Sequence, residues 1–240
     1  MATIGGSNIV KSGLVLELDA ANARSYPGSG TTWSNLSGNN YSGSLVNGPT
    51  FNSANGGSIV FDGTNDYVQF SSISSLILSN NQFTTNYWLQ ITGSARGDFF
   101  SIKNFNASAD DIGFFIDTDN KLYAYIQVLG TLSNNVGGRS SVSTAALSRN
   151  TIYNITCMKD ASQKIAMYIN GVLDNNTYST TTNTANVAST ALWIASNRSN
   201  ATTPTLAWPG RIYCVQVYNR ALSATEISQN YNAQKSRFGL

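Results

Sequence analysis

The chain has 240 residues, with 14 basic and 12 acidic side chains and no histidine. The lack of histidine excludes Ser–His–Asp and Cys–His catalysis and histidine-ligated zinc or iron, and a net charge of +2 supplies no basic field for nucleic acid. Charged residues make up only 11% of the chain, against about 25% in typical soluble proteins. The 41% of hydrophobic residues still predicts a packed domain, with a surface made polar mainly by amides and hydroxyls.

Residues 1–11 read as an extension that precedes the folded domain. They have neither the basic opening nor the apolar run of a secretory signal, and no stretch of the chain approaches the roughly 20 apolar residues of a membrane span. We therefore expect no signal peptide, no transmembrane segment and no membrane partner. Either a leader has been trimmed, or the protein leaves its cell by lysis as virion proteins do, and Met1 favours the second explanation.

The first predicted strand is Leu14–Asp19, in which alternate leucines share one face. Residues 20–57 are rich in Gly, Ser, Asn and Thr, so we expect a long loop pinned by scattered aromatic residues, with a short strand near 43–46. Ser58–Phe70 then holds two β-rich runs around Asp62-Gly63-Thr64-Asn65. These turn residues tolerate positive φ and local hydrogen bonds, and the segment predicts a tight strand–turn–strand unit.

Gln82–Ile91 is a predicted strand whose two faces differ in chemistry. One face is mainly apolar, whereas Asn86, Trp88 and Gln90 lie on the other. An aromatic plane beside amides is the chemistry of a sugar-binding platform, so these three are the candidate ligand-binding residues. The alternative is that a loop such as 20–57 covers Trp88, which then serves packing alone, as most large aromatic side chains do.

Further strands are predicted at regular intervals, with a weaker one at Ser140–Leu147. Asp117–Asn120 and Asp160–Gln163 connect hairpins, and Asn170-Gly171 is a strong type I′ turn signal. The strands are 98–103, 112–117, 121–128, 151–159, 164–169, 191–196 and 211–218, with a polar loop over 177–191. Cys157 and Cys214 fall within two of them, and we expect free, buried thiols.

A helix is predicted near the C-terminus. Ser223 followed by Glu226 is a capping box, and Ile227 and Tyr231 share one helix face. The tail Lys235–Leu240 has no strand left to join, so we expect it to lie outside the core, as an attachment or homo-oligomer contact.

The pattern as a whole predicts an all-β fold: a two-sheet antiparallel jelly-roll sandwich with one short C-terminal helix. We expect one domain, with the sandwich over residues 12–222, the extension over 1–11, and the helix and tail over 223–240.

Four segments, in this order, add a family resemblance. They are Phe61-Asp-Gly-Thr-Asn-Asp-Tyr-Val68, the hairpin formed by Asn154–Asp160 and Ala166–Leu173, Leu192–Ala195, and Pro209–Ile227. Together they resemble laminin-G-like domains of the concanavalin A-like lectin/glucanase superfamily, over about residues 12–234. The C-terminal segment also resembles laminin-G-like proteins of tailed phages.

The expected lack of a signal peptide, the amide-rich surface and the resemblance of the C-terminal segment together favour a non-enzymatic virion structural protein of a tailed phage. We expect it on the virion surface, as a capsid decoration, fibre or tail-associated module. Its expected partners are other virion proteins and host-surface polysaccharide. The alternative is a carbohydrate-binding or adhesion module of a secreted bacterial protein. Glucanase relatives use a Glu-x-Asp-x-x-Glu strand motif, which nothing in this chain matches, so we expect no enzyme.

No cofactor is expected apart from calcium, which relatives of this fold often bind through oxygen ligands. Asp19, Asp62 and Asp66 are the candidate ligands. Where many relatives carry an Asp-Glu pair in the last strand, this chain has Tyr213-Cys214. The other interpretation is that Asp62 and Asp66 stabilise their turn through bonds to the backbone.

Overall fold

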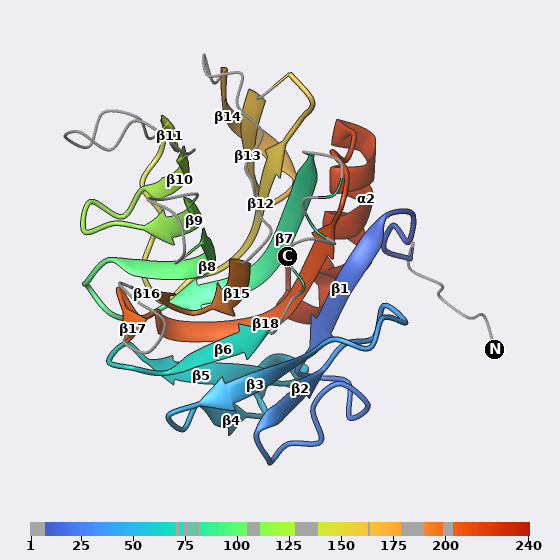
Figure 1. Ribbon diagram of the computed structural model, residues 1–240, viewed down its shortest axis with the longest axis vertical. Helices are drawn as coiled ribbons and strands as arrows, with labels where there is room; N and C mark the ends of the chain where they lie inside the picture. Colours follow the sequence, from blue (N-terminus) through green and yellow to red (C-terminus); the bar gives the residue numbers. More distant parts are fainter. Residues whose placement is uncertain are drawn as a thin grey trace.

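The computed structural model describes residues 8–70, 73, 77, 79, 82–104, 111–127, 139–162, 164–178, 190–198 and 204–240. These residues form two eight-stranded antiparallel sheets packed face to face, and helix α2 (Ala224–Gln234) packs on the outer face of one of them (Figure 1). The expected two-sheet sandwich with a short C-terminal helix is therefore confirmed. No helix among the described residues has the length and apolar character needed to cross a membrane.

Sheet A has the strand order β14-β13-β12-β7-β18-β5-β4, and β1 also pairs with β18. Its strands are β1 (Leu14–Asp19), β4 (Thr50–Asn52), β5 (Ser58–Asp62), β7 (Phe83–Ile91), β12 (Ile152–Lys159), β13 (Lys164–Ile169), β14 (Val172–Tyr178) and β18 (Pro209–Tyr218). The pairing of β1 with β18 brings residues near the two ends of the chain together. In the same region, the Asn230 side chain of α2 accepts a hydrogen bond from the Val10 N–H at 2.8 Å.

Sheet B has the order β11-β10-β9-β8-β15-β6-β3-β2. Its strands are β2 (Thr32–Ser34), β3 (Ser42–Val46), β6 (Tyr67–Phe70), β8 (Gly97–Asn104), β9 (Asp111–Ile116), β10 (Leu122–Gln127), β11 (Arg139–Val142) and β15 (Thr190–Ile194). A small pair, β16 (Asn197–Arg198) and β17 (Pro204–Thr205), lies beside them, and 3-10 helices cover Ala54–Gly56 (η1) and Lys235–Phe238 (η2). The segment 20–57 thus holds three short strands, where the sequence indicated a loop with one.

Ser58–Phe70 forms both expected strands, but they do not pair with each other. β5 belongs to sheet A and β6 to sheet B, so the turn between them carries the chain from one sheet to the other. The Asp62 carboxylate accepts hydrogen bonds from the Thr64 N–H at 2.7 Å and the Asn65 N–H at 3.3 Å, and Gly63 has φ +76°. The two strands and the turn are therefore as predicted, and the unit that they form is a corner between the two sheets.

The two later hairpins agree with their turn signals. Asn170 and Gly171 both have positive φ, 52° and 76°, as a type I′ turn requires, and they join β13 to β14. Asp160 accepts bonds from the Ser162 and Lys164 N–H groups, each at 2.9 Å, in the turn between β12 and β13. Most of the polar loop predicted over 177–191 lies outside the described residues, although β14 continues to Tyr178.

The core lies between the two sheets and is rich in aromatic side chains. Phe83 and Tyr87 of β7 point inward, as the alternation predicted, and contact the sheet B rings of Phe99, Phe100 and Phe114. Cys157 and Cys214 are buried and free, also as predicted. Leu89 and Ile91 of β7 also belong to this core, and the same alternation sets Asn86 and Trp88 on the outer face of sheet A.

Candidate functional site

The outer face of β7, which carries Asn86 and Trp88, is covered by the C-terminal segment. Both side chains have no exposed surface. The Trp88 ring stacks on Phe238 of η2, with ring centroids 4.2 Å apart, and on Tyr231 of α2 at 5.7 Å. The expectation of an exposed sugar platform is therefore wrong for these two residues. Trp88 packs, as the alternative held, but its cover is the C-terminal segment rather than residues 20–57.

The polar groups of Asn86 and Trp88 form hydrogen bonds with other side chains. Asn86 donates to the Gln216 side chain at 2.5 Å and accepts from the Thr156 hydroxyl at 2.7 Å. The Trp88 Nε1–H donates to Gln234 of α2 at 3.0 Å. Polar groups that would read a sugar's hydroxyls thus form a buried network, which holds the helix on the sheet.

Gln90, the third candidate ligand-binding residue, lies beyond this cover. It is partly exposed, and its amide donates to the Asn150 carbonyl at 2.7 Å. Without an exposed ring beside it, Gln90 offers a single polar side chain that is already bonded to a loop. The structure therefore does not bring the three predicted residues together on one open surface.

The tail Lys235–Leu240 is also packed, in contrast to the expectation that it stands apart. Arg237 donates to the Asp19 carboxylate at 2.8 Å and to the carbonyls of Asn55 at 2.7 Å and Gly57 at 2.8 Å. Phe238, which is only partly exposed, forms the cover over Trp88. Phe238 joins no strand, but it packs on the Trp88 ring at the outer face of sheet A.

The three candidate calcium ligands do not converge. Asp19 lies opposite Cys214 on β18 and Asp62 opposite Pro209, so the two are five residues apart along β18, or about 16 Å. Asp19 is paired with Arg237, and Asp66 accepts from the Asp62 N–H at 3.1 Å. Asp62 and Asp66 thus stabilise the turn, as the other interpretation held. Among the described residues, no group of three or more His, Cys, Asp or Glu side chains could hold a metal ion.

A different surface carries the chemistry that was expected of β7. We call it the β10 face: Arg96, Phe115, Asp119, Tyr123 and Tyr125, on the outer side of sheet B. Leu122, before the first tyrosine, and Ala124, between the two, point into the core. Tyr123 and Tyr125 therefore point outward, and both are partly exposed.

The rings of the β10 face are ordered across the hairpin of β9 and β10. Tyr123 lies opposite Phe115, with the ring centroids 5.0 Å apart and the planes only 5° from parallel. Its hydroxyl donates to the exposed Asp119 carboxylate at 3.0 Å, and this bond raises the pKa of Tyr123. The Tyr125 ring lies over Gly113, where any Cβ would overlap it, so glycine at this position gives the ring its place.

Two buried polar residues, Asp98 and Asn197, form hydrogen bonds to residues of the β10 face. The Arg96 guanidinium lies 3.5 Å from the Phe115 ring centroid and binds both oxygens of Asp98, at 2.9 and 3.3 Å. Asn197 donates to Asp98 at 2.9 Å and to the Tyr125 hydroxyl at 2.8 Å. Asp98 is fully buried, and its burial raises the pKa of the carboxyl against the opposing effect of Arg96. This network therefore fixes the Tyr125 hydroxyl directly, and it fixes Tyr123 through the Phe115 ring that Arg96 contacts.

The β9–β10 hairpin was predicted from the sequence, but the β10 face was not. The signal was present in Leu122-Tyr123-Ala124-Tyr125, whose alternation puts two tyrosines on one side of the strand. Arg96 and Asn197 carry no local signal, because they come from segments about a hundred residues apart and meet only in the folded sheet.

The family model for Laminin_G_3, of the concanavalin A-like lectin/glucanases superfamily, matches residues 62–228, which is more than half of the chain. The chain belongs to this superfamily. The matched range includes both β7 and β10, so membership of the concanavalin A-like superfamily does not by itself choose between their outer faces. A search among curated proteins gave no match.

Solved structures agree with this assignment of the fold. Similar ones include the binding domain of botulinum neurotoxin serotype D (14% identity, TM-score 0.67, covering 94% of this chain and 53% of that one). The Trypanosoma rangeli sialidase in complex with 2,3-difluoro-KDN gives 14% identity and TM-score 0.68, over 98% and 37%. The binding domain of Paraclostridial Mosquitocidal Protein 1 gives 16% identity and TM-score 0.68, over 93% and 52%. The chain thus spans about half or less of the length of these three proteins.

Proposed function

We propose that the chain is a non-enzymatic carbohydrate-binding module whose binding site is the β10 face. The observation that carries this proposal is the partial exposure of Tyr123 and Tyr125 on a hydrogen-bonded hairpin. The comparable ring on the opposite sheet, Trp88, is fully buried.

The chemistry of the β10 face suits a sugar. A tyrosine ring can cover the apolar C–H face of a pyranose, while its hydroxyl and a neighbouring carboxylate exchange hydrogen bonds with the sugar's hydroxyls. Asp119 supplies that carboxylate, next to Tyr123. Because the rings are already held by Phe115 and Asn197, binding does not have to order them first.

Several features support a role without catalysis. Both oxygens of Asp98 are engaged by Arg96 and Asn197, which leaves this buried carboxylate poorly placed to exchange protons with a substrate. The chain has two glutamates, and Glu226 caps α2 while Glu17 pairs with Lys11. Most glycosidases place two carboxylates on either side of the sugar, whereas Asp119 is the one carboxylate among the five described residues that define the β10 face.

The biological setting that we propose is the surface of a tailed-phage virion, with host polysaccharide as the ligand and other virion proteins as neighbours. The resemblance of the C-terminal segment to laminin-G-like phage proteins supports this setting. The alternative is an adhesion module of a secreted bacterial protein, which would use the same face. Gene neighbourhood separates the two: adjacent capsid or tail genes favour the virion, and a secretion or cell-wall context favours the adhesin.

Glycan binding is the direct test of the proposed function. A shallow surface site should bind a single glycan with an affinity on the order of millimolar, about −4 kcal/mol. The protein should therefore be presented multivalently on beads against a broad glycan panel. We expect the wild-type protein to retain a subset of glycans. Tyr123→Ala and Tyr125→Ala should each abolish this retention while circular dichroism and the melting curve show a folded domain.

Matched carboxylate variants provide the control. Asp119 and Asp160 both accept backbone N–H bonds in hairpin turns, but only Asp119 lies on the β10 face. We expect Asp119→Asn to weaken retention and Asp160→Asn to leave it unchanged. The proposal fails if the wild-type protein retains no glycan, or if Tyr123→Ala and Tyr125→Ala retain the same glycans as the wild type.

A further inference from the structure

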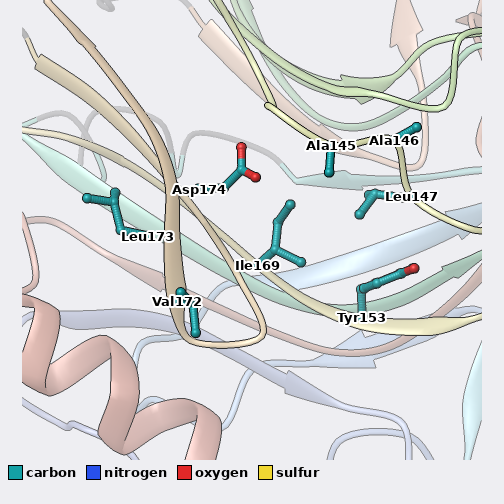
Figure 2. Close-up of a pocket in the computed structure, with 8 residues that line it drawn as sticks. All are labelled: Ala145, Ala146, Leu147, Tyr153, Ile169, Val172, Leu173 and Asp174. Atoms are coloured by element: carbon teal, nitrogen blue, oxygen red, sulfur yellow. The ribbon is translucent and has the colours of Figure 1, made fainter.

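A cavity of about 260 Å³ opens at the edge of the sandwich where β14 and the segment after β11 come together. It is separate from the β10 face. Figure 2 shows its lining side chains. The residues that line it are Ala145, Ala146, Leu147, Tyr153, Ile169, Val172, Leu173 and Asp174.

The walls of the cavity are largely apolar. Leu147 is buried, whereas Ile169 and Tyr153 are partly exposed. At the rim, the side chains of Val172 and Leu173 are 70% and 45% exposed, and they are two of four large hydrophobic side chains that the described residues leave exposed. Exposed apolar side chains gathered beside a concave surface are typical of a ligand site.

One carboxylate breaks this apolar lining. Asp174 Oδ2 accepts a hydrogen bond from the Thr144 N–H at 2.7 Å, and the Asp174 carbonyl accepts from the Thr144 hydroxyl at 3.2 Å. These two bonds tie β14 to the segment after β11 and fix the carboxylate at the cavity. Among the described residues, Oδ1 accepts no hydrogen bond and no cation pairs with the group.

A local irregularity of the sheet presents this carboxylate to the cavity. In the pairing of β13 with β14, Met167 lies opposite Asn175 and Tyr168 opposite Leu173, so Asp174 is the extra residue of a bulge. Bulges redirect a side chain relative to regular alternation and often occur beside functional sites. In Figure 2 the Asp174 carboxylate and Ile169 lie across from Ala145 and Leu147.

We propose that this cavity binds a small organic cation: an ammonium group carried on a compact apolar or aromatic body. The free carboxylate oxygen would accept a charge-assisted hydrogen bond from the ammonium, and Leu147, Ile169 and Tyr153 would cover the body. The volume lies below the roughly 300–1,000 Å³ of sites for drug-sized ligands, so the ligand must be smaller. This site is independent of the β10 face and of the proposed glycan function.

Two probes of similar shape, one charged and one uncharged, test the proposal. Benzylamine and benzyl alcohol differ at the group that would meet Asp174, and binding of each to the full chain can be followed by NMR shifts of the Ala145, Ala146 and Ile169 methyl groups. We expect benzylamine to bind on the order of millimolar, about tenfold tighter than benzyl alcohol. Asp174→Asn should remove this preference, because an amide oxygen keeps the bond to Thr144 but lacks the charge.

Two further variants make the test specific. Asp160→Asn removes a carboxylate from the turn at the other end of β13, away from the cavity, and should leave the preference intact. Ala145→Trp adds a ring at an exposed rim position and should block both probes without changing the core. Equal binding of the two probes, a preference that survives Asp174→Asn, or no shift of the cavity methyl groups would each overturn the proposal.

Discussion

The outer faces of the two sheets carry similar side chains with opposite outcomes. On β7, Trp88 lies beside amides and is fully buried under α2 and η2; on β10, Tyr123 and Tyr125 lie beside Asp119 and remain partly exposed. The bond from Trp88 to Gln234 spans 146 residues of sequence. An aromatic residue flanked by polar groups on an outward strand face therefore does not identify a binding platform until the covering segment is known.

Substitutions on the two faces should differ most in their effect on the stability of the fold. Trp88→Ala removes a buried ring that stacks on Phe238 and Tyr231, and should lower the free energy of unfolding by about 3–5 kcal/mol. Tyr123→Ala, at a partly exposed position, should cost about 1 kcal/mol or less. Urea unfolding measures both. Equal losses for the two variants would contradict the different burial of the two faces.

Removal of residues 235–240 should produce the next largest effect. It deletes the ring stacked on Trp88 and the ion pair of Arg237 with Asp19, and we expect a loss of about 2 kcal/mol. Acrylamide quenching of tryptophan fluorescence should rise, because Trp88 gains solvent access. Removal of Gly239 and Leu240 alone is the control, since Leu240 is 49% exposed. An unchanged melting temperature after the longer deletion would show that the tail does not stabilise the sandwich.

The ion pair between Arg220 and Glu226, at the start of α2, should make the packing of α2 on sheet A sensitive to acid. The hydrogen bond from Arg220 lowers the pKa of Glu226 to about 2, and the Ser223 N–H adds to this effect. A carboxyl with a lowered folded-state pKa stabilises the fold above its unfolded value of about 4.3 and loses that contribution as pH falls toward 2.

Glu226→Gln should therefore cost about 1 kcal/mol at pH 7 and progressively less between pH 5 and 2. Glu17→Gln, at the pair with Lys11, is the charge-matched control. Unfolding measured across this pH range checks the trend. A cost of Glu226→Gln that stays constant with pH would contradict the assigned role of the Arg220 pair.

The smallest expected effect concerns the β10 face itself. Tyr123→Phe removes only the hydroxyl that bonds Asp119, so stability should change by no more than about 0.5 kcal/mol. Under the proposed function, glycan retention should fall a few-fold and not vanish, because the ring remains. Complete loss of retention would mean that the hydroxyl, not the ring face, provides the contact.

Local patterns in the sequence determined most of the secondary structure. Alternation placed β7, β9, β10, β12 and β13, the Asn170-Gly171 pair specified a type I′ turn, and Ser223 with Glu226 specified the start of α2. Each of these depends on residues a few positions apart, whose steric and hydrogen-bonding preferences act within one turn or one strand. Free, buried thiols were expected for Cys157 and Cys214 because both fall within predicted strands, and both are buried; Cys157 lies between the sheets, whereas Cys214 lies in the cluster with Trp88 and Phe238.

Only the tertiary structure decided which partners these elements meet. The Asp62–Asn65 turn has the local features of a hairpin, yet β5 and β6 join different sheets, because strand pairing is set by neighbours far away in sequence. Phe238 covers Trp88, and Arg96 and Asn197 meet at Asp98, for the same reason. Alternation decides which side of a strand a residue occupies; whether that side stays open depends on packing between distant segments, which local preferences do not encode.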